Sequence, residues 1–231
     1  MSMPKHIAII LDGNRRFSKK LRARPWKGHE WGAKKVEMLF SWCEEYGITE
    51  LTLYTFSLEN FQRSRTEVSY LMNLFRKEFD RLKDDERIAR NRIRINFAGR
   101  LHLFPEDIQE RMNGLMESTG KHSRYIVNFA MGYGGRAEIV DAARKIAEQV
   151  KSGRLKIEGI NEETFSRNLY LSGEPDMIIR TGGEVRTSNF LNYQGAYSEW
   201  VFLEKTWPEF EKKDLADCIA EYAKRERRFG K

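Results

Sequence analysis

Apolar residues follow two patterns along the chain, short continuous runs and longer stripes with the spacing of a helix. The runs, rich in Ile, Leu, Val and aromatic residues, predict strands at 6–11, 51–56, 92–98, 125–130, 176–180 and 200–203. The stripes predict helices at 27–46, 105–118, 161–171 and 211–227, and two more whose inward faces span 68–82 and 139–150. Strands that alternate with helices are typical of the α/β class, so we expect one open, mostly parallel sheet with helices on both faces.

Length and composition restrict the class of protein. At 231 residues the chain has the size of one α/β domain, and we expect a single domain over residues 1–231. No run of about 18 apolar residues is present and the first strand follows Met1–Pro4 directly, so we expect neither a spanning helix nor a signal peptide. Cys43 and Cys218 occupy apolar helical positions, which is typical of buried thiols in a cytosolic protein.

The balance of charges favours an anionic partner. Lysine and arginine number 41 against 34 acidic residues, which gives a formal net charge of +7. Such an excess attracts nucleic acid, an acidic membrane surface or diphosphate substrates, and charge alone does not choose among them.

A polar sequence follows the first predicted strand directly. It consists of Asp12, Gly13, Asn14, Arg15 and Arg16. Ligands of open α/β sheets bind beyond the carboxyl ends of the strands, which is where these residues would lie. Arginine donors match phosphate oxygens and a carboxylate oxygen suits Mg²⁺, so the sequence predicts a metal-and-phosphate site. A solvated turn after an ordinary strand is the alternative.

Two later strands end in sequences of the same kind, at 57–63 and 180–188. Each combines arginine with serine, and the second adds a pair of glycines. The loops of the common nucleotide-binding folds, GxxxxGK[ST] and GxGxxG, are absent, and so is the GxSxG turn of serine hydrolases. Three polar strand ends indicate a ligand site of a different type.

The motifs together resemble one enzyme family, the cis-prenyltransferases, which include undecaprenyl and dehydrodolichyl diphosphate synthases. They are DGNRRF, GH, FSLENFQR, YGGR, RTGGEVRTSNF and RERRFG, with Gln194, Tyr197 and Glu199, and they run in order from residue 5 to 230. Arg15 and Val185 resemble the archaeal and eukaryotic branch. The resemblance implies a six-stranded parallel sheet with an apolar tunnel and an obligate homodimer. It also implies Mg²⁺-dependent, repeated addition of isopentenyl diphosphate to an allylic diphosphate primer, which yields a polyprenyl diphosphate, the precursor of a lipid glycan carrier.

The resemblance also implies roles for individual residues. Asp12 and Asn60 are the expected catalytic residues, and Asp12 and Glu199 the expected metal ligands. The allylic diphosphate would contact Gly13, Asn14, Arg15, Arg16, Phe17, His29 and Arg24, the last because Pro25 stands where the family has a basic residue. A polar wall beside the reacting carbons would consist of Ser57, Phe61 and Arg63, supported by Glu67. Isopentenyl diphosphate would bind Arg180, Arg186 and Ser188.

Two features allow more than one interpretation. The apolar stripes at 36–43 and 68–82 are the candidate tunnel lining, with Met72, Phe75 and Phe79 as a ruler for product length, but they would serve equally as core. The terminal sequence RERRFG would either place cations at the end of a helix or complete the active site of a partner subunit.

Two other classes of protein fit the sequence less well than the enzyme. A non-catalytic partner subunit of a prenyltransferase heterodimer would lack Asp12, Arg16, Asn60 and Arg186, all of which are present. A nucleic-acid-binding protein would gather its cations in a stripe, whereas here they are spread among acids. We therefore expect an enzyme without a nucleic-acid partner, placed in the cytoplasm and able to make peripheral contact with a membrane.

Overall fold

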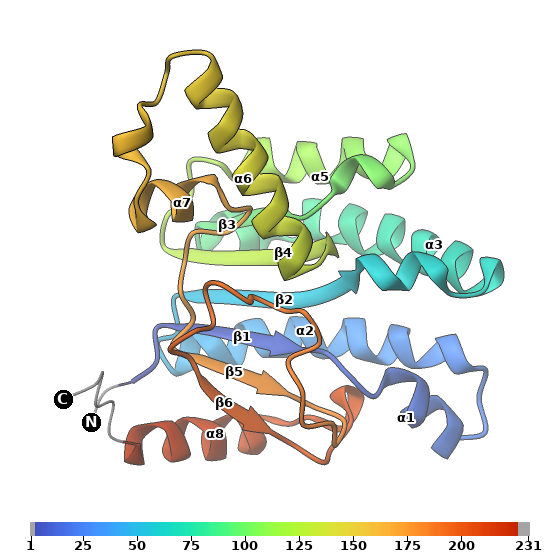
Figure 1. Ribbon diagram of the computed structural model, residues 1–231. Coiled ribbons are helices and arrows are strands. Elements are labelled where there is room, and N and C mark those ends of the chain that lie inside the picture. Colours follow the sequence, from blue (N-terminus) through green and yellow to red (C-terminus); the bar gives the residue numbers. More distant parts are fainter. Residues whose placement is uncertain (1–2, 226–231) are drawn as a thin grey trace.

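Six parallel strands form the centre of the structure, a computed structural model that describes residues 3–225 (Figure 1). In spatial order the strands are β3 (Ile93–Ala98), β4 (Tyr125–Tyr133), β2 (Glu50–Ser57), β1 (His6–Ile10), β5 (Met177–Arg180) and β6 (Glu199–Phe202). Every pairing between neighbours is parallel. The predicted open, parallel, six-stranded sheet is therefore confirmed, with β4 longer than the apolar run that indicated it.

Helices cover both faces of this sheet (Figure 1). They are α1 (Asn14–Lys20), α2 (Gly28–Glu45), α3 (Arg65–Lys83), α4 (Glu86–Arg90), α5 (Glu106–Thr119), α6 (Gly135–Lys151), α7 (Glu162–Asn168) and α8 (Lys212–Lys224). Apolar side chains of α2, α3, α5 and α8 form one large core with the strands. The opposite face carries α6, α7 and a second, smaller apolar cluster around Tyr54, Tyr133 and Phe190.

Helix α6 buries a different face from the one that its apolar stripe predicted. The prediction placed Val140, Ala143 and Ala147 inward with Ile146, but only Ile146 of these is buried, and Val140 is 46% exposed. The inward position belongs to Glu138, whose carboxylate accepts hydrogen bonds from the backbone N–H groups of residues 170 and 171. Burial raises the pKa of Glu138. Hydrogen bonds to otherwise unpaired donors turn a glutamate inward, which an apolar pattern does not indicate.

Further differences from the predicted elements are local. Helix α1 was not predicted and begins at Asn14, directly after Gly13. Gly13 has a φ of 98°, and a Cβ at this position would lie 2.6 Å from Cβ of Thr206. Helix α7 is shorter than predicted, and α4 is a separate short helix. The glycine allows the chain to turn sharply from strand to helix, so the arginines of the first motif lie on α1.

Two predictions about the whole chain concern cysteines and membrane spans. Cys43 and Cys218 are both unpaired and buried, as predicted, and burial raises the pKa of each thiol to about 12. Among residues 3–225, no helix has the length and apolar character needed to cross a membrane.

Parallel pairing brings three polar strand ends to the same edge of the sheet. Ile10, the last residue of β1, is paired with Tyr54 of β2 and with Arg180 of β5. Asp12 and Ser57 follow these positions at the carboxyl edge. Glu199 begins β6 and is paired with Met177, so it lies at the opposite edge. The register of the sheet alone therefore separates the two predicted metal ligands.

Candidate active site

A polar cavity of about 680 Å³ lies at the carboxyl end of β1. Its walls come from the turn after β1, from α1 and from the start of α2. The lining is strongly basic and includes Arg15, Arg16, Lys19, Arg22 and Arg63, together with Asp12, Asn14 and His29. Clustered positive charges and the N–H donors of arginine side chains suit a ligand with several phosphate oxygens. Lys19 and Arg22 were not predicted as site residues, because a helical α1 was not expected.

Asp12 is the centre of a network that joins β1 to β5. Its Oδ2 accepts a hydrogen bond from Nη2 of Arg180 at 2.8 Å, and its Oδ1 accepts one from the Gly13 N–H at 2.6 Å. Nη2 of Arg16 lies 3.3 Å from Oδ1. Burial alone would raise the pKa of Asp12, but the hydrogen bonds from Arg180 and Gly13 and the charge of Arg16 outweigh it and lower this pKa. Asp12 is thus held as a carboxylate among cations.

Arg180 links the same carboxylate to the third polar strand end. Its side chain is 3% exposed, and its Nη1 donates to the carbonyl oxygen of Arg186 and to Oγ of Ser188, each at 2.6 Å. Glu184 accepts hydrogen bonds from both Arg16 and Arg186. A buried guanidinium therefore fixes the loop at 180–188, while exposed arginines from two strand ends meet at one glutamate.

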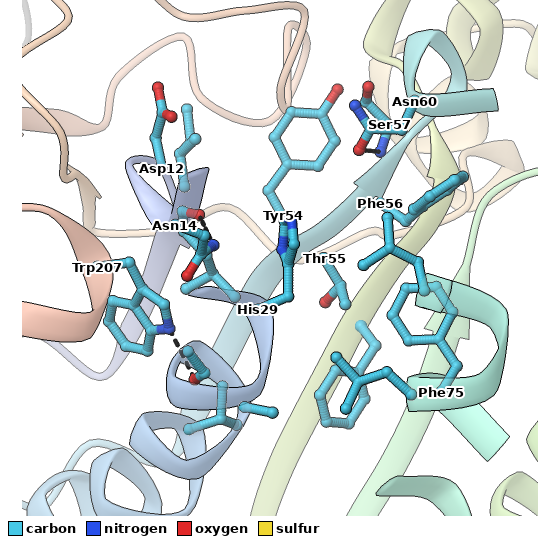
Figure 2. A pocket seen from close by; sticks show the side chains of 18 of the residues that line it. Asp12, Asn14, His29, Tyr54, Thr55, Phe56, Ser57, Asn60, Phe75 and Trp207 are labelled. Atoms are coloured by element: carbon cyan, nitrogen blue, oxygen red, sulfur yellow. Dashed lines mark hydrogen bonds between the residues drawn. The ribbon is translucent and has the colours of Figure 1, made fainter. Parts of the chain in front are cut away.

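The second polar strand end is stabilised by its own hydrogen bonds. Ser57 and Asn60 form a reciprocal cap of the short helix at Leu58–Gln62, in which Oδ1 of Asn60 accepts from the Ser57 N–H at 3.1 Å (Figure 2). Arg63 then donates to the buried Glu67 at 2.9 Å. This cap fixes the Asn60 side chain at the carboxyl end of β2.

His29 lies between the polar strand ends with its side chain 16% exposed. Its Nε2 is 3.8 Å from Oε1 of Glu67 and has no hydrogen-bond partner among the described residues. Burial lowers the pKa of His29, and the nearby charges of Arg63 and Arg15 lower it further, against the opposing effect of Glu67. An unpaired, buried ring nitrogen in an arginine-lined cavity is a group that a bound ligand would satisfy.

A second, mainly apolar cavity of about 650 Å³ continues from the polar one. The two share the side chains of Asp12, Asn14, His29 and Arg63. From there the apolar cavity runs between α2 and α3 over the face of β2, lined by Val36, Phe40, Phe56, Leu71, Leu74, Phe75 and Leu82. Figure 2 shows Asp12 and Asn14 on one side of this space and Phe56 and Phe75 on the other. A charged region and an apolar channel therefore meet at Asp12.

Polar contacts connect α2 with α3, and three of the side chains involved, His29, Glu37 and Arg81, line this apolar cavity. The pairs are His29 with Glu67, Glu30 with Tyr70, and Glu37 with Arg81. The last of these joins the two helices by a 2.6 Å hydrogen bond from Nη2 of Arg81 to Oε2 of Glu37. Bridging side chains thus connect the two helices on either side of the cavity.

The predicted ruler residues do not all face the cavity. Phe75 lines it, but Met72 and Phe79 are buried in the core instead. Phe79 contacts Phe75 and the strand residue Phe97, with ring centroids 5.9 and 4.9 Å apart. The cavity face of α3 is rotated toward Leu71, Leu74 and Leu82. The apolar stripe is wider than the cavity, so one part of it lines the channel and the other packs on the sheet.

The structure brings most of the predicted site residues together. Those that line one or both cavities are Asp12, Gly13, Asn14, Arg15, Arg16, His29, Ser57, Asn60, Arg63, Arg180, Arg186 and Ser188. Phe17 packs against Trp31, the Arg24 guanidinium lies over Trp26, and Phe61 packs against Phe56 and Phe104. Tyr54 and Asn189 line the apolar cavity but were not predicted.

Glu199 does not share a site with Asp12 in this chain. It lies at the amino-terminal edge of the sheet, and its carboxylate accepts a 2.7 Å hydrogen bond from Arg225. Within the described chain, no three His, Cys, Asp or Glu side chains are grouped to hold a metal ion. A cation at Asp12 would therefore need most of its ligands from substrate and water, as Mg²⁺ in phosphate sites commonly does.

An arginine-lined cavity joined to an apolar channel defines a site for a molecule with a phosphorylated head and a hydrocarbon chain. The family model described as putative undecaprenyl diphosphate synthase matches residues 10–230. The chain therefore belongs to this prenyltransferase family.

Relatives and solved structures agree with this assignment. The tritrans,polycis-undecaprenyl-diphosphate synthase (geranylgeranyl-diphosphate specific) of Thermococcus kodakarensis is 50% identical over 100% of this chain and 88% of its own. An isoprenyl transferase of Thermus thermophilus is 43% identical over 99% of this chain and 89% of its own. Lavandulyl diphosphate synthase from Lavandula x intermedia, solved with dimethylallyl diphosphate, has a TM-score of 0.91 at 33% identity and covers 99% of both chains.

These comparisons confirm the predicted family, its archaeal branch and the class of enzyme. The chain is a prenyltransferase, an enzyme that transfers alkyl groups, and this function is supported over a nucleic-acid-binding or non-catalytic role.

The lowered pKa of His29 predicts a pH dependence of stability. Below its ordinary pKa of 6.5, the unfolded chain binds a proton that the folded chain, with its lowered pKa, does not. The free energy of unfolding should therefore fall as the pH drops below 6.5, by up to about 1.4 kcal/mol per pH unit for this group. The free energy of unfolding can be measured by urea unfolding between about pH 5.5 and about pH 7.5, on either side of the ordinary histidine pKa. His29→Gln should reduce the slope of this free energy against pH. His6, whose pKa burial also lowers, should account for part of the remaining slope. Equal slopes in both proteins would contradict a neutral His29.

Proposed function

We propose that the two connected cavities catalyse the repeated condensation of isopentenyl diphosphate with an allylic diphosphate, which produces a polyprenyl diphosphate. The observation that carries this proposal is the shared wall at Asp12 and His29, where the basic cavity opens into the apolar one. A diphosphate bound by the arginines would direct its hydrocarbon chain between α2 and α3. The chain gains free energy there by leaving water.

The allylic diphosphate is assigned to the cavity at α1. Arg15, Arg16 and Arg22 line it with Lys19, and the unpaired Nε2 of His29 faces the same space. The names of the archaeal relatives specify geranylgeranyl diphosphate. Geranylgeranyl diphosphate is therefore the primer to test first. Arg24, the basic residue expected from the sequence, contributes less to this proposal because Lys19 and Arg22 line the cavity instead.

Isopentenyl diphosphate is assigned to the loop at 180–188. The buried Arg180 fixes the loop through the carbonyl oxygen of Arg186 and the Ser188 hydroxyl, and the Arg186 side chain is left 59% exposed beside Glu184. Arg186 is thus available to a diphosphate, whereas Arg180 is a positioning residue already committed to Asp12. The two heads would then approach each other across Asp12, which brings the reacting carbons together.

The chemistry requires charge stabilisation and no covalent nucleophile. The allylic C–O bond breaks and the diphosphate leaves with the electron pair, while the alkene of isopentenyl diphosphate supplies the new C–C bond. A proton then passes to a basic oxygen of the site and restores a double bond. Fixed arginine donors stabilise the leaving diphosphate, and Ser57 and Asn60 form the polar wall beside the reacting carbons.

Mg²⁺ is the proposed metal, and Asp12 is the protein ligand that we assign to it from the described residues. The carboxylate is ionised and its side chain is 31% exposed, so it suits a cation that takes its remaining ligands from diphosphate and water. Bound there, Mg²⁺ would supply additional positive charge against the leaving diphosphate. Glu199 could serve a metal only at the site of a second subunit, because of its position at the other edge of the sheet.

We further propose a homodimer in the cytoplasm that makes peripheral contact with the membrane receiving its product. The C-terminal motif that would complete a partner's site lies at 225–230, and residues 226–231 fall outside the described part of the chain. Sedimentation velocity should show one species near twice 27.3 kDa, and a monomer at micromolar concentration with full activity would exclude the obligate dimer.

Removal of the Asp12 charge should abolish turnover. Asp12→Asn is the preferred variant, because its amide oxygen can still accept the Arg180 hydrogen bond, whereas Asp12→Ala leaves a buried guanidinium without this partner. We expect a loss of about 100-fold or more in kcat with Mg²⁺ present. The melting temperature should fall less than in Asp12→Ala, because the amide keeps an acceptor for Arg180 and loses only the charge. Asp80→Ala is the control, since Asp80 pairs with Arg111 outside the cavities. Turnover of Asp12→Asn near the wild-type level would exclude this role.

The two diphosphate sites should respond separately to mutation. Arg186→Ala should raise the KM for isopentenyl diphosphate, and Arg16→Ala the KM for the allylic primer. Each variant removes a charged contact worth about 1.5–3 kcal/mol, or roughly 10- to 150-fold in affinity. The exposed Arg144→Ala serves as a control of equal charge change. Equal effects of both variants on one substrate would show that the loops are assigned wrongly.

A further inference from the structure

The segment 188–191, at the end of the loop that begins at Arg180, has a backbone conformation that is rare for residues with a Cβ. Ser188, Asn189 and Leu191 have φ values of 50°, 61° and 47°, in the left-handed region. In the described part of the chain, two other non-glycine residues have a positive φ, and both lie elsewhere. The left-handed region is unfavourable for such residues, least so for asparagine. Surrounding contacts must therefore hold this segment in place.

Asn189 supplies two of these contacts, both with the first turn of α6. Its carbonyl oxygen accepts a 2.7 Å hydrogen bond from the N–H of Gly135, and its Oδ1 accepts one from the N–H of Arg136 at 2.9 Å. The first N–H groups of a helix have no partner within the helix. Gly134, which precedes α6, has no side chain that could cap them. Asn189 therefore caps α6 from a position 53 residues beyond Arg136.

The two glycines of the YGGR motif make room for this contact. A Cβ at Gly134 would lie 2.8 Å from Nδ2 of Asn189, and a Cβ at Gly135 would lie 2.8 Å from Cγ of Asn192. Asn192 in turn donates a hydrogen bond to Oδ1 of Asn189 at 3.1 Å. Glycine allows this close approach because it has no Cβ. The YGGR motif, to which the proposed chemistry assigns no role, is thus the surface against which the segment 188–191 packs.

The same loop contributes side chains to the large cavity. Arg186, Ser188 and Asn189 all line it. Arg180 fixes the loop on one side of Asn189, through the carbonyl oxygen of Arg186 and the hydroxyl of Ser188. The contact with α6 fixes it at Asn189 itself. The part of the loop assigned to a diphosphate is therefore held at both ends.

We propose that Asn189 is a positioning residue for isopentenyl diphosphate. By capping α6, it holds the segment 188–191 in the left-handed conformation in which Arg186 and Ser188 line the cavity. The inference rests on the proposed function, which assigns isopentenyl diphosphate to this loop, and it extends that function to Asn189 and the YGGR motif. The effect should be confined to one substrate, because no residue of the segment 188–191 lines the cavity at α1 that is assigned to the primer.

Steady-state kinetics with isopentenyl diphosphate and geranylgeranyl diphosphate test the proposal. Asn189→Gly removes the side-chain cap but accepts the left-handed backbone, so its effect comes from the lost hydrogen bond. We expect it to raise the KM for isopentenyl diphosphate about 5-fold, the change that corresponds to one net hydrogen bond, and to leave the KM for the primer unchanged. Asn189→Asp keeps an acceptor for the Arg136 N–H and should return the KM for isopentenyl diphosphate to within about 2-fold of the wild-type value.

Asn161→Gly is the matched control. Oδ1 of Asn161 accepts a 2.9 Å hydrogen bond from the Thr164 N–H at the start of α7, and Asn161 lines neither substrate cavity. This variant also loses a helix cap, but both KM values should stay unchanged. Phe190 is fully buried and stacks on Tyr54 in the wild type, an anchor that no variant alters, and thermal melts show which variants are folded.

Three kinetic results would overturn the proposal. One is an unchanged KM for isopentenyl diphosphate in folded Asn189→Gly protein. Another is an equal rise in KM for both substrates, and the third is the same rise in Asn161→Gly.

Hydrogen exchange separates this inference from the proposed function, because it needs no turnover. Exchange of the residues 184–192 is measured by mass spectrometry at increasing concentrations of isopentenyl diphosphate with Mg²⁺. The ligand should slow this exchange in the wild type, and Asn189→Gly should need a concentration about 5-fold higher for the same protection. A wild type that is protected but does not turn over would disprove the proposed function, and the shift in Asn189→Gly would still support the role of Asn189. Identical protection curves for the two proteins would overturn that role, and absence of protection in the wild type would overturn both.

Discussion

The ion pair between Asp12 and Arg180 is the interaction on which the rest of the site depends. It joins the ends of two neighbouring strands, and the same guanidinium fixes the loop at 180–188 through Ser188 and a backbone carbonyl. A buried arginine without this carboxylate would carry an uncompensated charge, which is strongly destabilising. The pair therefore couples the shape of the loop at 180–188 to the ionised state of Asp12. A charged substrate would then bind in a site where the charged side chains of Asp12 and Arg180 are already held in place.

The second constraint is the space between α2 and α3. Close packing of these helices would give a tighter core, but it would remove the channel. Instead, polar pairs such as Glu37 with Arg81 connect the helices along the edge of the cavity, while Val36, Leu74 and Leu82 face the space itself. Half-buried apolar side chains without complete packing partners are costly in a protein without a ligand. A hydrocarbon chain in the channel would supply the missing contacts, so substrate binding would complete the packing of the fold.

The sequence predicted an open, mostly parallel sheet and most of the residues at its carboxyl edge. Continuous apolar runs that end in arginine, serine and an aspartate carry this information locally, because parallel strands bring their carboxyl ends to one edge. The family motifs added the expected chemistry of the cavity, and Asp12, Asn60, Arg63 and Arg186 all line it. Helix α1 was not predicted from the sequence. The turn that leads into it depends on the left-handed conformation of Gly13, which lies close to Thr206, a residue distant in the sequence. Lys19 and Arg22 were missed for the same reason.

Tertiary structure decided the features that depend on which way an element faces. Glu199 and Asp12 both belong to family motifs, but the register of β6 against β5 places them at opposite edges. An apolar stripe on α3 shows that the helix packs against something, and only the rotation of the helix assigns Phe75 to the channel and Phe79 to the core. Likewise Glu138 is buried because two distant backbone N–H groups need its carboxylate. Local sequence thus determines what each segment can form, and long-range contacts determine which side chains meet.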